Sequence, residues 1–338
     1  MLRRHETDEA VPPEGGALIG IDWGTSSLRA WRMSASGLVL DEAQAPWGIL
    51  NLPDGGYPAA LTALLSNWPD AAGLPLIACG MVGSANGWRE VPYVDCPADG
   101  ASLARALARP DTAAGVTGAP GIVPGVRQRH PLPDVMRGEE TQIVGALALH
   151  SGLAADSTLI LPGTHSKWAR VQDGRIMGFA TAMTGELFAV LSRHSILGRP
   201  ADGAPAVTED EARDAFRRGV LAAAASRQGV APLLFSARAL FLGGGIGAAA
   251  TRDYLSGLLV GDEVRAGLAD RPGAPLTILV GEERLCGLYA RAFDILGAPV
   301  PQSVGNTAPA GLYQIAVEAG YVVPATQPPP GREEGRQT

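Results

Sequence analysis

Short hydrophobic runs separated by tight turns open this chain and predict three consecutive β-strands. This order argues against a nucleotide-binding β-α-β start, in which a helix follows the first strand. The expected strands are residues 18–22, 28–33 and 38–42, with Ser36-Gly37 as the second turn. Leu61, Leu64 and Leu65 recur at helical spacing and predict a helix over residues 57–68. A further short strand is expected at residues 76–79.

The same order of elements returns in mid-chain. A helix with Ile143 and Leu147 on its apolar face is expected over residues 139–150, and three strands are then expected at 158–161, 167–172 and 175–180. Asp173-Gly174, between the last two, is a strong hairpin turn. Later elements are a strand over 276–280 and helices over 285–296 and 305–318. This repetition predicts a duplicated βββαβα unit in an α/β protein with a cleft between the copies.

Two glycine-hydroxyl turns follow the first strand of each copy, namely Gly24-Thr25-Ser26 and Gly163-Thr164-His165-Ser166. In such a turn, glycine lets the backbone approach an anion, and the Thr or Ser offers an N–H and a hydroxyl. One turn can hold one anion, whereas two facing turns can hold a polyphosphate. Only the first has a carboxylate, Asp22, at the strand end, where it could hold a hydrated Mg²⁺.

Length and charge narrow the class of protein. The chain has 338 residues, with 27 basic and 34 acidic side chains, and its arginines are scattered, so we expect no nucleic-acid partner. No apolar stretch has membrane-spanning length, and the first fifteen residues lack the apolar core of a signal peptide, so we expect no membrane association and a cytoplasmic location. Cys79, Cys96 and Cys286 are odd in number, far apart and in no CxxC spacing, so we expect reduced thiols and neither a disulfide framework nor a zinc site.

Seven sequence strings, in order, resemble the 2-dehydro-3-deoxygalactonokinase family of the sugar-kinase, Hsp70 and actin superfamily. They are Ile21-Asp22-Trp23-Gly24, Leu28-Arg29-Ala30-Trp31, Gly80–Ser84 with Gly87-Trp88, residues 135–142, Pro162–Trp168, Met183–Leu187 and Ser256–Gly261. The resemblance implies two RNase H-like domains of the actin-like ATPase fold. It also implies ATP-dependent phosphorylation of 2-dehydro-3-deoxy-D-galactonate at its terminal 6-hydroxyl, with Mg²⁺, in galactonate breakdown.

The domain boundaries follow from the repeat and this resemblance. We expect a disordered segment over 1–15, and an N-terminal domain over 16–150 on the substrate and phosphate side. A C-terminal domain over 151–322 should hold the nucleotide, with its last helix crossing back to the first domain. The Pro-rich tail over 323–338 should be disordered.

The general base is expected in Glu139 or Glu140, which follow Arg137-Gly138 and open an apolar helix. A helix N-terminus favours an ionised carboxylate, which can accept the proton of the attacking hydroxyl. Glu139, directly after the glycine, is preferred. Both glutamates could instead only complement the helix dipole, and Asp22 or Glu186 could act as the base.

Substrate contacts are expected in three places. Arg137 offers a guanidinium to the substrate carboxylate, or is a surface arginine. The loop Gly80-Met81-Val82-Gly83-Ser84 lies where related kinases line the sugar pocket, and Trp88 either stacks on the carbon chain or packs in the core. Glu186 either binds substrate hydroxyls or opens a helix.

Nucleotide contacts are expected in the second half. Gly163, Thr164 and Ser166 would cradle the outer phosphates, Lys167 would neutralise the transferred charge, and His165 would donate a hydrogen bond to phosphate or substrate. For adenosine, Gly281 and Glu282 in a late strand-glycine-helix connection are preferred over the glycine-rich run 243–247.

Two other functions stay open from sequence. One is a different carbohydrate or sugar-acid kinase of the same superfamily, and the other is an ATP-gated binding protein. The preferred epimer is open, as is the formation of a homodimer.

Overall fold

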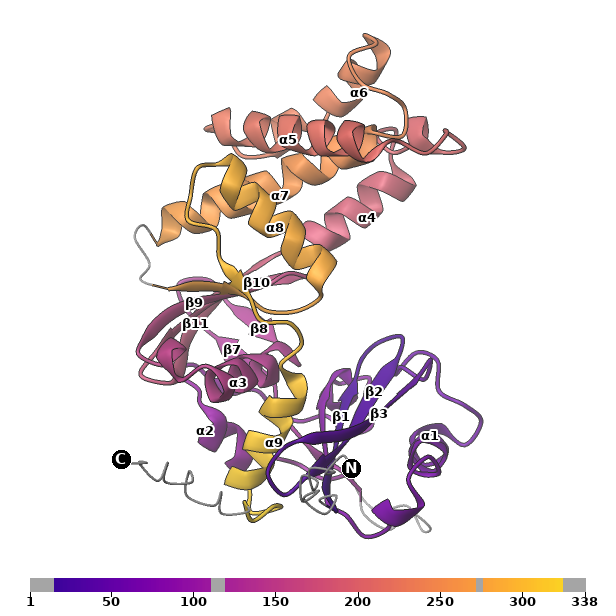
Figure 1. Ribbon diagram of the computed structural model, residues 1–338, viewed down its shortest axis with the longest axis vertical. Coiled ribbons are helices and arrows are strands. Elements are labelled where there is room, and N and C mark those ends of the chain that lie inside the picture. The colour runs from indigo at the N-terminus through magenta and orange to yellow at the C-terminus, as the bar shows by residue number, and fades with distance from the viewer. Residues whose placement is uncertain (1–14, 111–118, 272–275, 325–338) are drawn as a thin grey trace, which may run out of the picture. The chain divides into compact units, whose positions relative to one another are not determined.

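The computed structural model describes residues 15–110, 119–271 and 276–324, which fold into two compact units (Figure 1). Unit 1 contains the described residues of 1–93, 100–125 and 308–338, and unit 2 contains those of 94–99 and 126–307. By compactness, residues 126–150 therefore belong with the second unit, whereas the boundary expected from sequence lies at residue 150. No helix in the described ranges is long and apolar enough to cross a membrane.

Unit 1 is built on a five-stranded sheet of order β3-β2-β1-β4-β6. The first three strands are antiparallel neighbours, and β4 and β6 add in parallel to β1. The strands are β1 (Gly16–Trp23), β2 (Leu28–Ser34), β3 (Val39–Ala45), β4 (Leu76–Gly80) and β6 (Gly121–Ile122). The helices are α1 (Gly56–Leu65), α2 (Gly100–Arg105) and α9 (Ala308–Glu318), with 3₁₀ turns at Pro69–Ala71 and Met81–Gly83.

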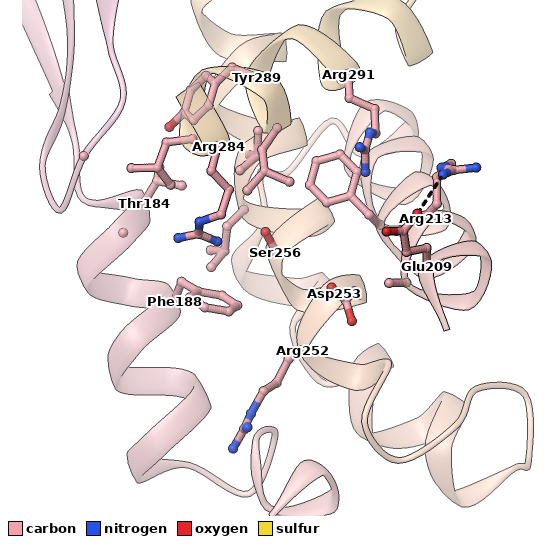
Figure 2. Close-up of a pocket in the computed structure, with 18 residues that line it drawn as sticks. Thr184, Phe188, Glu209, Arg213, Arg252, Asp253, Ser256, Arg284, Tyr289 and Arg291 are labelled. Atoms are coloured by element: carbon pink, nitrogen blue, oxygen red, sulfur yellow. Dashed lines mark ion pairs between the residues drawn. The ribbon is translucent and has the colours of Figure 1, made fainter. Parts of the chain in front are cut away.

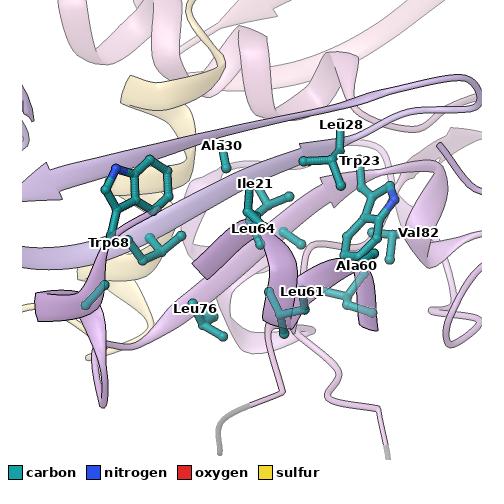
Figure 3. Packing of buried hydrophobic residues seen from close by; sticks show 14 of the residues in the cluster. Ile21, Trp23, Leu28, Ala30, Ala60, Leu61, Leu64, Trp68, Leu76 and Val82 are labelled. Atoms are coloured by element: carbon teal, nitrogen blue, oxygen red, sulfur yellow. The ribbon is translucent and has the colours of Figure 1, made fainter. Parts of the chain in front are cut away.

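The core of unit 1 lies between this sheet and α1 (Figure 3). Leu61 and Leu64 on α1 and Trp23 and Leu28 on the strands are fully buried, as the helical spacing of leucines predicted. The indole N–H of Trp23 donates to the carbonyl of Trp47 at 2.7 Å, so this large ring is buried without an unpaired polar atom. Helix α9 packs against β1, β4 and α2.

Unit 2 repeats this sheet with order β11-β10-β9-β12-β13, again three antiparallel strands followed by two parallel additions. The strands are β9 (Asp156–Leu161), β10 (Ser166–Gln172), β11 (Arg175–Ala182), β12 (Thr277–Leu279) and β13 (Gln302–Ser303). Asp173 and Gly174 both have positive φ, which the expected hairpin turn between β10 and β11 requires. The identical strand order confirms the predicted duplicated α/β fold.

A small sheet of order β5-β7-β8, which the sequence did not predict, joins residues 94–99 and 126–136 to unit 2. Its strands are β5 (Val94–Asp95), β7 (Val126–Gln128) and β8 (Asp134–Met136), and helix α3 (Glu139–Leu149) follows. Asp134 accepts hydrogen bonds from the N–H and hydroxyl of Thr181 on β11, at 2.8 and 2.7 Å. These bonds place the start of α3 beside the β9–β11 sheet.

Helices α4 to α7 fill the stretch between β11 and β12. They are α4 (Thr184–His194), α5 (Glu209–Ala225), α6 (Ser236–Leu242) and α7 (Thr251–Asp270), and α8 (Glu283–Ile295) follows β12. Short 3₁₀ turns lie at Ser151–Leu153, Arg199–Ala201 and Ala231–Leu233.

Helices α5 and α7 pack with their backbones in close contact. A Cβ on Gly257 would lie 2.1 Å from the carbonyl oxygen of Phe216, and one on Gly219 would lie 2.3 Å from that of Tyr254. Gly261 approaches Val220 in the same way, with 2.8 Å to its Cα. The glycines of the Ser256–Gly261 string are therefore helix-packing residues.

Candidate functional site

The turn after β1 is held by the loop at residues 48–50. The N–H of Gly24 donates to the carbonyl of Ser27 at 2.9 Å, which closes the turn. The carbonyls of Gly24 and Thr25 accept from the N–H groups of Ile49 and Leu50, at 3.1 Å each. Because both carbonyls are held on that side, Thr25 and Ser26 are left exposed at the end of the strand.

Asp22 is the second-last residue of β1 and is half-buried. One carboxylate oxygen accepts from Arg29, its cross-strand partner on β2, at 3.2 Å. Gly80, which ends the adjacent parallel strand β4, has φ +90°, and a Cβ there would lie 2.8 Å from the carbonyl of Trp23 and 3.2 Å from Asp22 Oδ1. Only glycine therefore lets the 80–84 loop lie directly against Asp22.

The substrate loop expected at residues 80–84 is partly core. Val82 and Gly83 are buried, and Val82 packs in the hydrophobic core of unit 1. Trp88 stacks on Tyr57, with ring centroids 5.3 Å apart and planes 8° apart, and meets Trp23 edge-on. Of the two alternatives left open for Trp88, the structure shows packing against the core.

The two glutamates that open α3 have different surroundings. Gly138, with φ +108°, turns the chain into the helix, and its N–H donates to both carboxylate oxygens of Glu140, at 2.9 and 2.8 Å. The hydroxyl of Thr141 adds a third bond. Glu140 is fully buried, and this burial, with the nearby charge of Glu139, raises its pKa to about 8.

Glu139 remains partly accessible, with about a quarter of its side chain exposed. One oxygen accepts from the backbone N–H of Arg137 at 3.0 Å, and the other lies 3.4 Å from Lys167 Nζ. The Lys167 side chain is almost wholly buried, and its ammonium also donates to the carbonyl of His165 at 3.0 Å. Burial of a lysine is costly unless it is paired, so this pair fixes the cation between α3 and the turn after β9.

The turn after β9 is joined to the first turn of α4. The N–H of Glu186 donates to the carbonyl of Thr164 at 3.0 Å, and a Cβ on Gly185 would lie 2.4 Å from the carbonyl of Gly163. The His165 ring bonds to the Glu186 carboxylate, and both side chains are about half exposed. These contacts form one cluster within unit 2. Its members are Arg137 (through its backbone N–H), Glu139, Lys167, His165 and Glu186.

Ser166 is used differently from the sequence prediction. Its side chain is fully buried, and its hydroxyl bonds to the Tyr289 hydroxyl at 2.7 Å and accepts from the N–H of Gly163 at 3.4 Å. The hydroxyl therefore holds the turn from within. Thr164 is exposed, and neither its N–H nor its hydroxyl has a partner among residues 15–110, 119–271 and 276–324.

A pocket of about 470 Å³ opens beside this turn, between α4, α5, α7 and α8 (Figure 2). Gly163, Thr184, Gly185 and Tyr289 line it beside the turn. Its apolar lining includes Phe188, Phe216, Leu259, Leu285 and Leu288, and its basic lining is Arg213, Arg252, Arg284 and Arg291. It lies at the carboxyl ends of β9 and β12, the edge where open α/β sheets bind ligands.

The glycine-acid connection after β12 borders this region. Gly281 has φ +134° and donates to the carbonyl of Gly305 at 2.9 Å. Glu282 caps α8, accepting from the N–H groups of Arg284 and Leu285 at 3.0 and 3.2 Å. Neither lines the pocket, although Arg284 and Leu285, the next helix residues, do. The run 243–247 lies elsewhere in unit 2, where Gly245 and Gly247 line a second pocket of about 310 Å³.

Sequence reasoning missed the pocket residues on α4, α7 and α8, among them Phe188, Ser256 and Tyr289. It also missed Glu263, a buried carboxylate on α7. Glu263 follows Asp262 but lies four residues after Leu259 and three after Val260, so it shares their helical face, and a carboxylate at that spacing is the sequence signal that marks it.

The sequence matches the family model for 2-keto-3-deoxy-galactonokinase over residues 22–315. It is 40% identical over 287 residues to a Rhizobium meliloti (strain 1021) protein named as a probable 2-dehydro-3-deoxygalactonokinase, covering 84% of this chain and 91% of that protein. It is 36% identical over 302 residues to the Escherichia coli (strain K12) 2-dehydro-3-deoxygalactonokinase, covering 88% and 97%. A crystal structure of a Sinorhizobium meliloti protein, provisionally given the same enzyme name, has a TM-score of 0.81 at 36% identity, covering 91% and 100%.

Proposed function

The chain belongs to the 2-keto-3-deoxy-galactonokinase family, and from that premise we propose that it phosphorylates 2-dehydro-3-deoxy-D-galactonate at the terminal 6-hydroxyl. ATP is the phosphoryl donor, and the products are ADP and 2-dehydro-3-deoxy-6-phosphogalactonate. The step belongs to galactonate breakdown, and we place it in the cytoplasm, where the free thiols Cys79, Cys96 and Cys286 would stay reduced.

The observation that carries the nucleotide part of this proposal is the pocket beside the 163–166 turn. Its apolar lining from α4 and α8 suits a purine base, and its arginines suit phosphate or ribose oxygens. The exposed Thr164 offers an N–H and a hydroxyl next to that pocket. Adenosine is therefore assigned to the α4–α7–α8 pocket, with Gly281 and Glu282 shaping α8 at its border.

Asp22 is the proposed protein ligand for Mg²⁺. The donor set fits this ion, because Mg²⁺ on a nucleotide keeps several waters and takes only one or two protein carboxylates besides the phosphates. In the described ranges, no group of three or more candidate ligand side chains lies together, which agrees with an ion held mainly by phosphate and water. When bound, Mg²⁺ would neutralise negative charge on the nucleotide phosphates.

Glu139 is the proposed general base. Its carboxylate is partly accessible and lies 3.4 Å from the Lys167 ammonium. Glu140 suits the task less, since it is fully buried and three bonds hold its carboxylate within the α3 start. Glu139 would take the proton of the 6-hydroxyl as that oxygen attacks the γ-phosphate, and Lys167 would offset the negative charge that remains nearby.

Recognition of the substrate is assigned to Arg137, Glu186 and the 80–84 loop. Arg137, next to the proposed base, would pair with the substrate carboxylate, since a planar guanidinium matches that group. Glu186 would accept from substrate hydroxyls beside His165, to which it is bonded. From the 80–84 loop we retain the half-buried Met81 and Ser84 and the backbone of Gly80 and Gly83, because the Val82 side chain is in the core.

The test is a coupled ADP-release assay with 2-dehydro-3-deoxygalactonate and its gluconate epimer. The variants are Asp22→Ala, Glu139→Ala and Glu140→Ala, each measured with Mg²⁺ and with excess EDTA. Glu139→Ala should lose turnover while it still binds ATP, and EDTA should stop the wild-type reaction. Turnover of neutral hexoses without turnover of either sugar acid would contradict the proposed substrate, and normal turnover by Glu139→Ala would exclude the proposed base.

A further inference from the structure

Glu263 is a buried carboxylate that joins four elements of unit 2. It lies on α7 with 8% of its surface exposed. Oε1 accepts from the indole N–H of Trp168 on β10 at 2.8 Å, and Oε2 accepts from the Tyr289 hydroxyl on α8 at 2.5 Å. Oε2 also accepts from the Thr184 hydroxyl at the start of α4. The carboxylate thus accepts three hydrogen bonds, which offset part of the cost of its burial.

The bonds from Glu263 continue to the 163–166 turn with a fixed direction. The single proton of the Tyr289 hydroxyl points to Glu263, so the Ser166 hydroxyl must donate its own proton to the Tyr289 oxygen. The remaining lone pairs of Ser166 then face the N–H of Gly163, 3.4 Å away. One chain of donors therefore runs from the turn through Ser166 and Tyr289 to the carboxylate.

The second branch reaches the other side of the same turn. Thr184 bonds to Glu263 and begins α4, and the next two residues of α4 contact the carbonyls of the turn. Gly185 lies against the carbonyl of Gly163, and the N–H of Glu186 donates to that of Thr164. The turn is thus held by Glu263 from within through Ser166, and from α4 through Thr184.

We propose that Glu263 is a positioning residue for nucleotide phosphate: through Tyr289 and Ser166, and through Thr184, it fixes the 163–166 turn so that Thr164 presents its N–H and hydroxyl to a phosphate. This inference rests on the proposed function, because it assigns phosphate to that turn. Glu263 itself touches no ligand in this proposal. Its effect should appear in the binding of phosphate groups and be absent from the binding of the nucleoside.

The experiment compares ADP with adenosine as titrants of wild-type protein and of Tyr289→Phe, Ser166→Ala and Tyr254→Phe. Tyr289→Phe keeps the ring and removes the link, and Ser166→Ala breaks the same link at the turn without touching the pocket lining. Tyr254→Phe is the matched control, because Tyr254 is an equally buried tyrosine whose hydroxyl bonds to Ser236, away from the turn. Thermal melting of each variant checks that it is folded.

We expect Tyr289→Phe and Ser166→Ala each to weaken ADP binding by about five- to tenfold, the range for loss of one neutral hydrogen bond. Adenosine affinity should stay within about twofold, and the double variant should lose no more than either single one, since both break one link. Unchanged ADP affinity in folded Ser166→Ala, or equal losses for ADP and adenosine, would overturn this inference and leave the proposed function standing. Failure of the wild type to bind ADP would overturn the proposed function as well.

Discussion

Lys167 Nζ lies 3.4 Å from Glu139 Oε1, and this ion pair connects the start of α3 to the start of β10, next to the turn that follows β9. The lysine side chain is almost wholly buried, whereas about a quarter of the Glu139 side chain is exposed. The cation is therefore fixed by its surroundings, and the carboxylate is the partner that a substrate can reach.

Replacing Lys167 by Met keeps an unbranched side chain of similar size and removes the charge. We expect kcat to fall by about a hundredfold or more, because the variant lacks the cation that offsets charge near the transferred phosphoryl group. The KM for the sugar acid should change far less. Steady-state kinetics of the folded variant measures both, and a variant that retains kcat would remove Lys167 from the proposed mechanism.

Glu140 should make the folded state less stable as the pH rises. Its pKa in the folded protein is about 8, above the value of about 4.5 for an unfolded glutamate, so the folded state binds more protons between these values. The stability that protonated Glu140 contributes is complete below about pH 4.5 and is lost as the pH rises through 8. The loss is on the order of a few kcal/mol.

Glu140→Gln should remove this dependence, because glutamine stays neutral and can still accept from the N–H of Gly138. Urea unfolding at pH 5, 7 and 9 measures the free energy of unfolding for both proteins. The free energy of unfolding of the variant should rise relative to that of the wild type as the pH increases from 5 to 9. Parallel curves for the two proteins would show that Glu140 does not titrate in this range.

Gly257→Ala should separate α5 from α7. The added methyl would lie 2.1 Å from the carbonyl oxygen of Phe216, a distance that neither backbone can accept without moving. We expect a loss of stability of about 3 kcal/mol or more, in the range of severe overpacking, measured as a lower melting temperature. The control is Gly287→Ala in α8, where nothing lies within 4 Å of the new methyl and helix propensity favours alanine.

Phe188→Ala should weaken ATP binding. Phe188 lines the pocket on α4, and loss of an aromatic face against a base costs about 1–3 kcal/mol. The KM for ATP should therefore rise by about fivefold or more, with little change in the KM for the sugar acid. Leu187→Ala is the control, because Leu187 is the neighbour of Phe188 in the chain, and its side chain is 41% exposed and does not line the pocket. Equal effects of the two changes would argue against a base at Phe188.

The repeated part of this fold was readable from local patterns. Strand alternation with the Ser36-Gly37 and Asp173-Gly174 turns marked both sheets, since turn chemistry and the period of two are properties of neighbouring residues. Helices α4 to α7 were not assigned, because their packing depends on contacts such as Gly257 with Phe216, between residues distant in sequence. The pattern of one segment does not show what packs against it.

Ser166 shows the same limit for the site. Beside glycine and threonine, its hydroxyl has the pattern of a phosphate ligand, and the sequence does not show that Tyr289 lies 2.7 Å away. Glu139 and Lys167 were each selected for their own chemistry, but their pairing required the structure. Glu263 was not selected, because acidic residues in a helix, such as the adjacent Asp262 and Glu263, are most often solvated.

The passage of the chain between its two units has a consequence for the order of folding during synthesis. The chain crosses from one unit to the other after residues 93, 99, 125 and 307. Helix α9, which covers β1 and β4, is among the last described segments to leave the ribosome. Leu312 packs beside Gly20, so this face of the unit 1 sheet is covered only after the residues that follow unit 2 have been synthesised. A nascent chain halted before Ala308 would expose that sheet face to chaperones.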